Sequence, residues 1–519
     1  MPPFWSRRLA LGTANKAMHA LMMAPDTWRH YTLTAKLHVA SAGCAFASFA
    51  GRVRPDAINL RLHIVPEGRP TTGEADVRAW CAGAVADMRD NLHASLQHIT
   101  NLGELVLVDD AENRTLAFLG LNGVTDSLTA LQRLEIATRA TRQSPEYWPR
   151  GLDLVTSLRR LKMPVRERIP EGLSRLSGLL EFVMVPHTHP LARRGPLLGM
   201  EHLPAGLGVL TLVGVGPSLR CLSRLTSLAQ LNMSLVDRDH PDHPAALAAL
   251  DAPDALPTSL RTLTLAHGPS EVPRCLARMR DLKHIFLVHC ELEHTAGLAD
   301  LGALTALRMV DCHGSGPPMD LTPVSGLSSL RALCVRSSPS RVGRIGVADL
   351  EPLRSLTALT SLDIDVSCNA VDLAPLDALT RLHVLGLVYT HAPALALHAP
   401  RRGIPAHISR LVSLRSLHIL DCTWASDFRA LASMTALTSL ALPGSLRGAI
   451  PSSVSKLTRL VKLDISRGGQ PVSRGFQHLR GLPALRQLTV SDTLPPASKA
   501  HLHAAMPDAI IVPGAHPAV

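Results

Sequence analysis

The sequence has few aromatic residues, which make up 3% of its 519 residues, whereas hydrophobic residues make up 46%. A core built from these residues must therefore consist of aliphatic side chains rather than large aromatic rings. Charged residues amount to only 18%, which argues against general disorder. No apolar run approaches the roughly 18 residues that a membrane-spanning helix needs. The composition predicts a folded, aliphatic-rich chain that does not span a membrane.

The nine cysteines also lack a pattern, since their number is odd and none forms a Cys-x-x-Cys pair. This excludes the paired frameworks of secreted domains and the ligand spacing of zinc sites. The first residues lack the apolar run and cleavage site of a secretory signal, although an organelle transit peptide stays open. We therefore expect an intracellular protein, cytoplasmic or nuclear.

The net charge of +11 is distributed unevenly. Residues 1–55 hold seven Lys and Arg against Asp26 alone, so this short segment carries more than half of the excess. A basic total with this distribution does not favour nucleic-acid binding.

One phrase recurs along the chain, Leu-x-x-Leu-x-x-Leu-x-aliphatic. A clear copy runs from Leu225 to Met233, and others end at Ile364, Leu387 and Ile465. We count about sixteen units. Their third apolar positions lie at Leu105, Leu134, Leu161, Phe182, Leu210, Leu231, Leu263, Ile285, Leu307, Leu333, Leu362, Leu385, Leu417, Leu440, Leu463 and Leu488. The mean step is about 25.5 residues, which lies within the range of a repeat protein.

The spacing predicts a short strand in every unit, because apolar residues two apart share one face of a strand. Parallel stacking of these strands would align the leucines into internal ladders that no single unit can bury alone.

The phrase resembles the leucine-rich-repeat family over residues 99–512. The resemblance implies an α/β solenoid, a horseshoe of about sixteen units with short parallel strands on its concave face and a helical N-terminal cap. The expected domains are a helical segment at 1–55, a capping strand and helix at 56–98, the solenoid at 99–512 and a tail at 513–519. Units with Ile-Pro, such as the one at 404–405, resemble plant-type repeats and predict an extended outer wall, whereas residues 245–255 read as a short helix.

Three cysteines, Cys290, Cys312 and Cys422, lie five residues after the third apolar position. The family places a buried Asn or Cys in this slot, so we expect structural rather than reactive thiols. Cys334 is expected to face outward.

The outward residues of the strands form the surface on which solenoids bind partners. Phe286, Val288 and Val310, with Arg308 and Arg336 beside them, form a candidate central patch, although ordinary exposed apolar residues are an equal alternative. Aromatic residues are too few to form a stacking platform for single-stranded nucleic acid, so a protein is the expected ligand. The full candidate set is His284, Phe286, Val288, Arg308, Val310, Arg336, Asp363, Asp365, Val384, Val388 and His418.

Longer units carry insertions after the strand, as at 187–194 and 237–243. The His and Asp residues at 239–243 could bind a metal, but their prolines favour a solvated loop. We expect no metal and no cofactor.

Before the repeats, residues 14–33 show helical apolar spacing, then a Pro-Asp turn and Trp28-Arg29. This segment resembles the second half of an F-box, while the first half of that module has no counterpart. The resemblance implies an Skp-type adaptor that would bind at Met18, Leu21, Trp28 and Arg29. A plain helical cap over the first ladder is the alternative.

No nucleotide, hydrolase or metalloprotease motif occurs, so we expect no enzyme. The leading hypothesis is a protein-binding scaffold, with substrate recognition in an SCF-type ubiquitin ligase as its specific form. A receptor-type ectodomain with glycans at Asn113 or Asn232 and a cytoskeletal or axonemal protein are the alternatives.

Overall fold

The computed structural model describes residues 32–38, 58–65 and, with gaps, 102–514. Gaps of ten or more residues within the last range fall at 110–127, 139–150, 186–195 and 391–405. The F-box-like positions, Asn113 and Cys422 lie outside the described residues.

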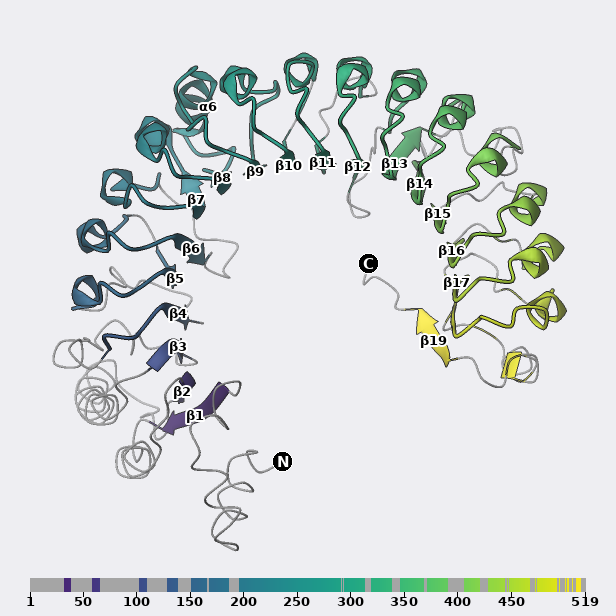
Figure 1. The fold of residues 1–519 in the computed structure, drawn as a ribbon, viewed down its shortest axis with the longest axis horizontal. Coiled ribbons are helices and arrows are strands. Elements are labelled where there is room, and N and C mark those ends of the chain that lie inside the picture. The colour runs from purple at the N-terminus through teal and green to yellow at the C-terminus, as the bar shows by residue number, and fades with distance from the viewer. Residues whose placement is uncertain are drawn as a thin grey trace, which may run out of the picture. The chain divides into compact units, whose positions relative to one another are not determined.

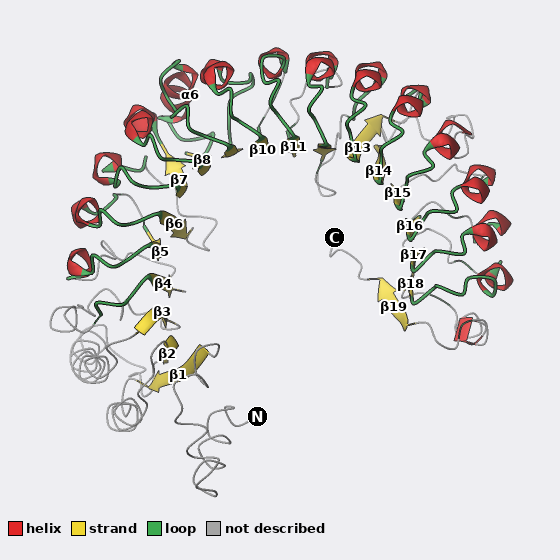
Figure 2. Ribbon diagram, in the orientation of Figure 1, coloured by secondary structure: helices red, strands yellow, loops and turns green. Residues whose placement is uncertain are grey.

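The chain forms two compact units, with the boundary between residues 250 and 260. In each unit, strands pair in parallel in the order of the sequence and lie on the inner side of a curved row, while short helices lie on the outer side (Figures 1 and 2). This arrangement is a leucine-rich-repeat solenoid, as the sequence predicts.

The first unit holds eight strands: β1 (Thr32–His38), β2 (Ile58–Val65), β3 (Leu102–Asp109), β4 (Arg133–Thr138), β5 (Arg160–Pro164), β6 (Glu181–Val185), β7 (Val209–Val215) and β8 (Gln230–Leu235). Its described helices are η2 (Leu152–Leu154), η3 (Glu171–Arg175), η4 (Met200–His202), η5 (Pro217–Arg224) and α6 (His243–Asp251), the last of which reaches the boundary.

The second unit holds β9 (Thr262–Ala266), β10 (His284–Val288), β11 (Ala306–Val310), β12 (Ala332–Arg336), β13 (Ser361–Ser367), β14 (Val384–Thr390), β15 (Ser416–Leu420), β16 (Ser439–Ala441), β17 (Lys462–Asp464), β18 (Gln487–Ser491) and β19 (Ile510–Gly514). One 3₁₀ helix joins each consecutive pair from β9 to β18: η6 (Arg274–Arg278), η7 (Ala296–Leu298), η8 (Thr322–Gly326), η9 (Glu351–Ser355), η10 (Ala374–Ala378), η11 (Ala406–Arg410), η12 (Arg429–Ser433), η13 (Ser452–Lys456) and η14 (Phe476–Leu479).

The third apolar residue of every predicted unit lies on a strand, from β3 to β18, and is almost fully buried. Within each compact unit, the parallel strand register pairs these residues with their counterparts on the next strand, Leu362 with Leu385 for example. Sixteen units are therefore confirmed. The strand array also begins before residue 99, since β1 and β2 pair in parallel with each other and with β3. Strand β1 falls inside the segment expected to be helical, and the rest of the predicted domain boundaries stay predictions.

The helices that the structure describes on the outer side are 3₁₀ helices, apart from α6, which falls on the predicted short helix. The expected extended wall at the Ile-Pro repeats is confirmed in part, since parallel bridges join Arg168 to Leu198 and Ala449 to Arg474 just before the prolines, and a 3₁₀ helix of five residues then follows. Pro170 and Pro451 are themselves extended and stand directly before η3 and η13, so each proline starts a short helix. Proline suits this place because the first helical N–H groups have no partner within the helix.

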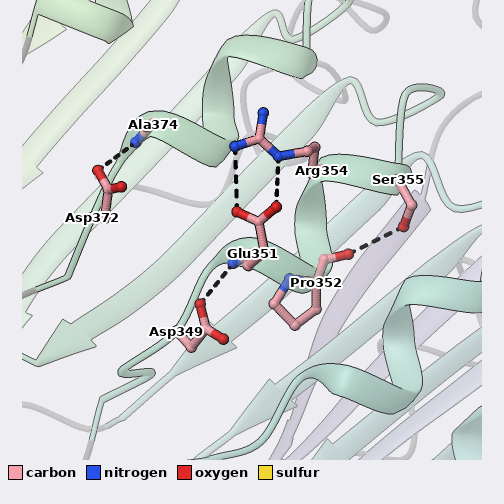
Figure 3. Close-up of polar contacts among 7 residues, drawn as sticks. All are labelled: Asp349, Glu351, Pro352, Arg354, Ser355, Asp372 and Ala374. Carbon is pink, nitrogen blue, oxygen red and sulfur yellow. Dashed lines mark hydrogen bonds and ion pairs between the residues drawn. The ribbon is translucent and has the colours of Figure 1, made fainter.

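Two side-chain patterns hold these helices. Asp320, Asp349 and Asp372 belong to consecutive Asp-Leu-x-Pro phrases, and each carboxylate accepts the N–H group two residues on, at 2.8–3.0 Å. Figure 3 shows the second and third of these contacts. Serine hydroxyls near the helix ends also donate to the carbonyl three residues earlier, as Ser355 does to Pro352. These local bonds satisfy groups that so short a helix leaves unpaired.

Candidate functional site

The predicted contact residues come together on six adjacent strands of the second unit, β10 to β15. Register places Phe286 beside Arg308, and Val288 beside Val310, which in turn lies beside Arg336. Neighbouring strands lie about 4.8 Å apart, so these five residues form one continuous surface. Asp363 on β13 and His418 on β15 continue the row of Phe286 and Arg308, whereas Val384 on β14 lies in the row of His284.

Phe286, Val288 and Val310 are each partly exposed, and together they form the apolar part of this surface, the central patch. Arg308 is exposed beside Phe286, and none of the described carboxylates lies within ion-pairing distance of its guanidinium. At the edge of the patch, His284 Nδ1 lies 3.2 Å from the hydroxyl of Thr262. The patch therefore offers an apolar area with one unpaired cation.

Arg336, by contrast, is held by two carboxylates. Its Nη1 lies 2.6 Å from Asp363 Oδ1, and its Nε lies 3.2 Å from Asp365 Oδ1. The side chain of Asp365 is only 2% exposed, and its other oxygen accepts the Ser337 N–H at 2.6 Å. A buried carboxylate needs such partners, because burial without them is costly. Arg336 thus acts as the fixed edge of the patch rather than as a free cation.

Two candidate residues are not available to a partner directly. The structure buries Asp365, as just described, and leaves Val388 only 3% exposed. Gly386 separates Asp363 from His418 in the middle row, and a Cβ there would collide with the Asp363 carboxylate. Because Gly386 has no side chain, the Asp363 carboxylate can occupy this space.

The edge where the strands end carries residues that the sequence analysis missed. His267, His289 and Asp311 directly follow β9, β10 and β11, and all three adopt left-handed backbone conformations with φ of 53–55°. Their N–H groups donate to Val288, Val310 and Arg336 of the next unit. The two imidazoles stack at 5.6 Å, and His289 Nδ1 lies 3.6 Å from the buried Asp311. His and Asp adopt left-handed conformations more readily than most residues. A His or Asp directly after a predicted strand is therefore the sequence signal that could have identified these three residues.

The first unit presents a different inner face. Glu104 pairs with Arg133, Glu135 with Lys162, and Glu181 with Arg160, at 2.8–3.4 Å. Charges on neighbouring strands therefore neutralise one another there. Asn232, a predicted glycan acceptor, lies on β8 of this face and donates to Thr211 at 3.3 Å.

The cysteines agree with the predicted structural role. Cys290 and Cys312 are buried, and their thiols donate to carbonyls of their own strands, while Cys422 is not described. A hydrogen bond with Cys290, together with burial, raises the pKa of the Cys312 thiol. Cys334 is partly exposed, and burial and the nearby Asp363 raise its pKa to about 11. The thiols of Cys312 and Cys334 are therefore protonated near neutral pH.

Within the described parts of the chain, no group of three or more metal-binding side chains occurs. Residues 238–242 form turns that lead into α6, and His243, the first residue of that helix, is buried with its Nδ1 2.9 Å from the Val236 carbonyl. The described helices include none with the length and apolar character to cross a bilayer.

No protein-family model and no curated protein matches this chain. Solved structures with similar folds include an internalin of Listeria monocytogenes, with 18% identity, coverage of 74% of this chain and 94% of that one, and a TM-score of 0.42. A leucine-rich-repeat protein of Leptospira interrogans is 14% identical over 80% of this chain and 91% of its own, with a TM-score of 0.40. The ectodomain of the receptor kinase GASSHO1 from Arabidopsis thaliana is 14% identical over 88% and 64%, with a TM-score of 0.33. Likenesses at this level carry no information about function, so the fold assignment rests on the register and burial of the chain itself.

Proposed function

We infer that the chain is a non-catalytic scaffold that binds a protein through the inner face of its second unit. The observation that carries this inference is the central patch, in which Phe286, Val288 and Val310 lie together beside the unpaired Arg308. Apolar residues flanked by arginine are the usual composition of an energetically important contact area.

The rigid surroundings of the patch support the same function. Parallel pairing fixes every strand, and the ion pairs of Arg336 fix its edge. A surface that is ordered before binding loses little conformational entropy when a partner docks.

The test compares two double variants of the full chain as bait for proteins of its own cell. F286S/V310S removes the apolar area, whereas L154S/V412S changes two apolar residues that are 59% and 70% exposed elsewhere. We expect a protein partner that binds the wild type and L154S/V412S but not F286S/V310S. A direct affinity measurement with the purified partner then checks the same order of binding. A partner retained by F286S/V310S, or the absence of any partner that depends on this face, would refute the proposal.

The ligase role is the more specific form of the proposal, and it rests on the F-box-like segment alone. It places an Skp-type adaptor on Met18, Leu21, Trp28 and Arg29. An adaptor pull-down should succeed with the full chain and fail without residues 1–40, and equal or absent binding in both would discard this role. Intracellular localisation stays a prediction that a tagged protein would check.

A further inference from the structure

A row of basic residues directly precedes the strands of the second unit. In six repeats of this compact unit, the residue directly before the strand is basic. We call these six residues the basic row: Arg261, Lys283, Arg331, His383, Arg415 and Arg486. The other four repeats have Thr305, Thr360, Thr438 and Val461 at this position. The residue directly before the strand is therefore never acidic from β9 to β18.

Backbone hydrogen bonds stack these residues directly on one another. The Lys283 N–H donates to the Arg261 carbonyl at 2.9 Å, and the same bond recurs at every step up to Arg486. Each step therefore equals one strand spacing, about 4.8 Å, and the nine steps from Arg261 to Arg486 span about 43 Å. The regular spacing of the basic row therefore follows directly from the repeat.

The charges of this row are not neutralised in place. Arg261, Lys283, Arg331, Arg415 and Arg486 are exposed, and no ion pair joins any member of the row to the part of the chain that the structure describes. This differs from the inner face of the first unit, where oppositely charged residues pair across strands. Unpaired like charges at short spacing attract an anionic partner and repel one another without it.

We propose that the basic row is a second binding surface, distinct from the central patch, that takes an extended acidic segment of a partner protein. An extended chain of about 13 residues would cover the row at about 3.3 Å per residue. Asp and Glu side chains of that chain would pair with the cations, and the threonine slots would leave room between them.

An acidic protein segment suits the row better than nucleic acid does. Single-stranded nucleic acid needs aromatic side chains for stacking, and His284 is the only aromatic residue among the ten first strand residues, from β9 to β18, that follow the row. Sequence-specific reading of a DNA duplex needs a helix or ribbon that enters a groove, whereas each residue of the row directly precedes a strand of the parallel sheet.

The chain itself supplies the substitution for a test. Thr305, Thr360 and Thr438 donate their hydroxyls to the carbonyl of the preceding unit at 3.0–3.1 Å, so threonine is a natural occupant of the slot. The test variant is R261T/K283T/R331T/R415T. The control variant, R220T/R354T/R410T/K456T, removes the same charge from 3₁₀ helices, which lie on the outer side of each compact unit.

The probe is a fluorescent poly-glutamate peptide of about 16 residues, added to each full-length protein at low salt and then at rising salt. We expect the wild type and the control variant to bind it with similar affinity and the test variant to bind at least about tenfold more weakly. Equal affinity of the test and control variants, or no binding by the wild type at low salt, would overturn the proposal. Tighter binding of oligo-dT or a short DNA duplex than of poly-glutamate at equal salt would overturn the assignment to a protein.

The result is separable from the function proposed above. F286S/V310S leaves the basic row intact and should bind poly-glutamate as the wild type does, even where it loses its protein partner. A loss of poly-glutamate binding in F286S/V310S would contradict the claim that the two surfaces are distinct.

Discussion

Replacing Arg336 by alanine should destabilise the second unit strongly. The substitution leaves the Asp365 carboxylate with the Ser337 N–H at 2.6 Å but without its guanidinium, and this carboxylate is almost completely buried. Removing one partner of a buried ion pair costs about 3–5 kcal/mol where the remaining charge is uncompensated, and Asp365 keeps a further interaction besides the Ser337 N–H. Part of this charge can be relieved by water, since Arg336 itself is 27% exposed, so we expect the lower end of that range.

The double variant R336A/D365N separates the charge effect from lost packing. Asparagine can still accept the Ser337 N–H, but it carries no charge to be compensated. We therefore expect the double variant to recover most of the stability that R336A loses. As a control, R354A breaks the ion pair with Glu351 that Figure 3 shows, in which both side chains are at least half exposed, and should cost at most about 1 kcal/mol.

Urea unfolding followed by circular dichroism measures these differences as shifts of the midpoint. Hydrogen exchange at the amides of β12 and β13 would show that the loss is local to this part of the solenoid. A cost for R336A no larger than that for R354A, or a double variant as unstable as R336A, would refute the view that Arg336 compensates a buried Asp365.

Three further predictions concern single residues. Cys334 should react with iodoacetamide at pH 8 about a hundredfold more slowly than a thiol of pKa 9.0, because its pKa is about 11, and labelling as fast as that of glutathione would contradict this. D320A should cost about 1 kcal/mol at pH 7, as the loss of a capping side chain does. Hydrogen bonds from Thr322 lower the pKa of the Asp320 carboxyl below 3.8, so this stabilisation is present above that pH and lost as the pH falls below it; a penalty that persists in acid would be evidence against the bonds. G386A should displace Asp363 from Arg336 and lower stability by about 1 kcal/mol, whereas G302A, where a Cβ meets nothing within 4 Å, should not; equal midpoints for both would show that the close contact does not matter.

The inner ladders were predictable to the residue because their cause is local. Leu231, Leu362 and Leu463 each stand in the same nine-residue phrase, and a two-residue spacing on a strand has only one way to bury both apolar side chains. The outer side was less predictable. Pro170 can stand in an extended wall or before a short helix with the same φ, and the choice depends on how each turn packs against the next.

The candidate site shows the same division. Alternation along β10 and β11 placed Phe286, Val288, Arg308 and Val310 on the inner face, as the structure has them. The burial of Asp365 could not be predicted in this way, because it depends on the Arg336 side chain of the neighbouring strand.

What the sequence by itself determined is the repeat, its strands and the face on which each strand residue lies, since these follow from spacing within one unit. Only the tertiary structure decided which charges neutralise one another and which stay free. Arg336 meets two carboxylates across adjacent strands, whereas Arg308 meets none of those described. The physical reason is that ion pairing depends on distances of about 4 Å between units that are some 25 residues apart in the chain.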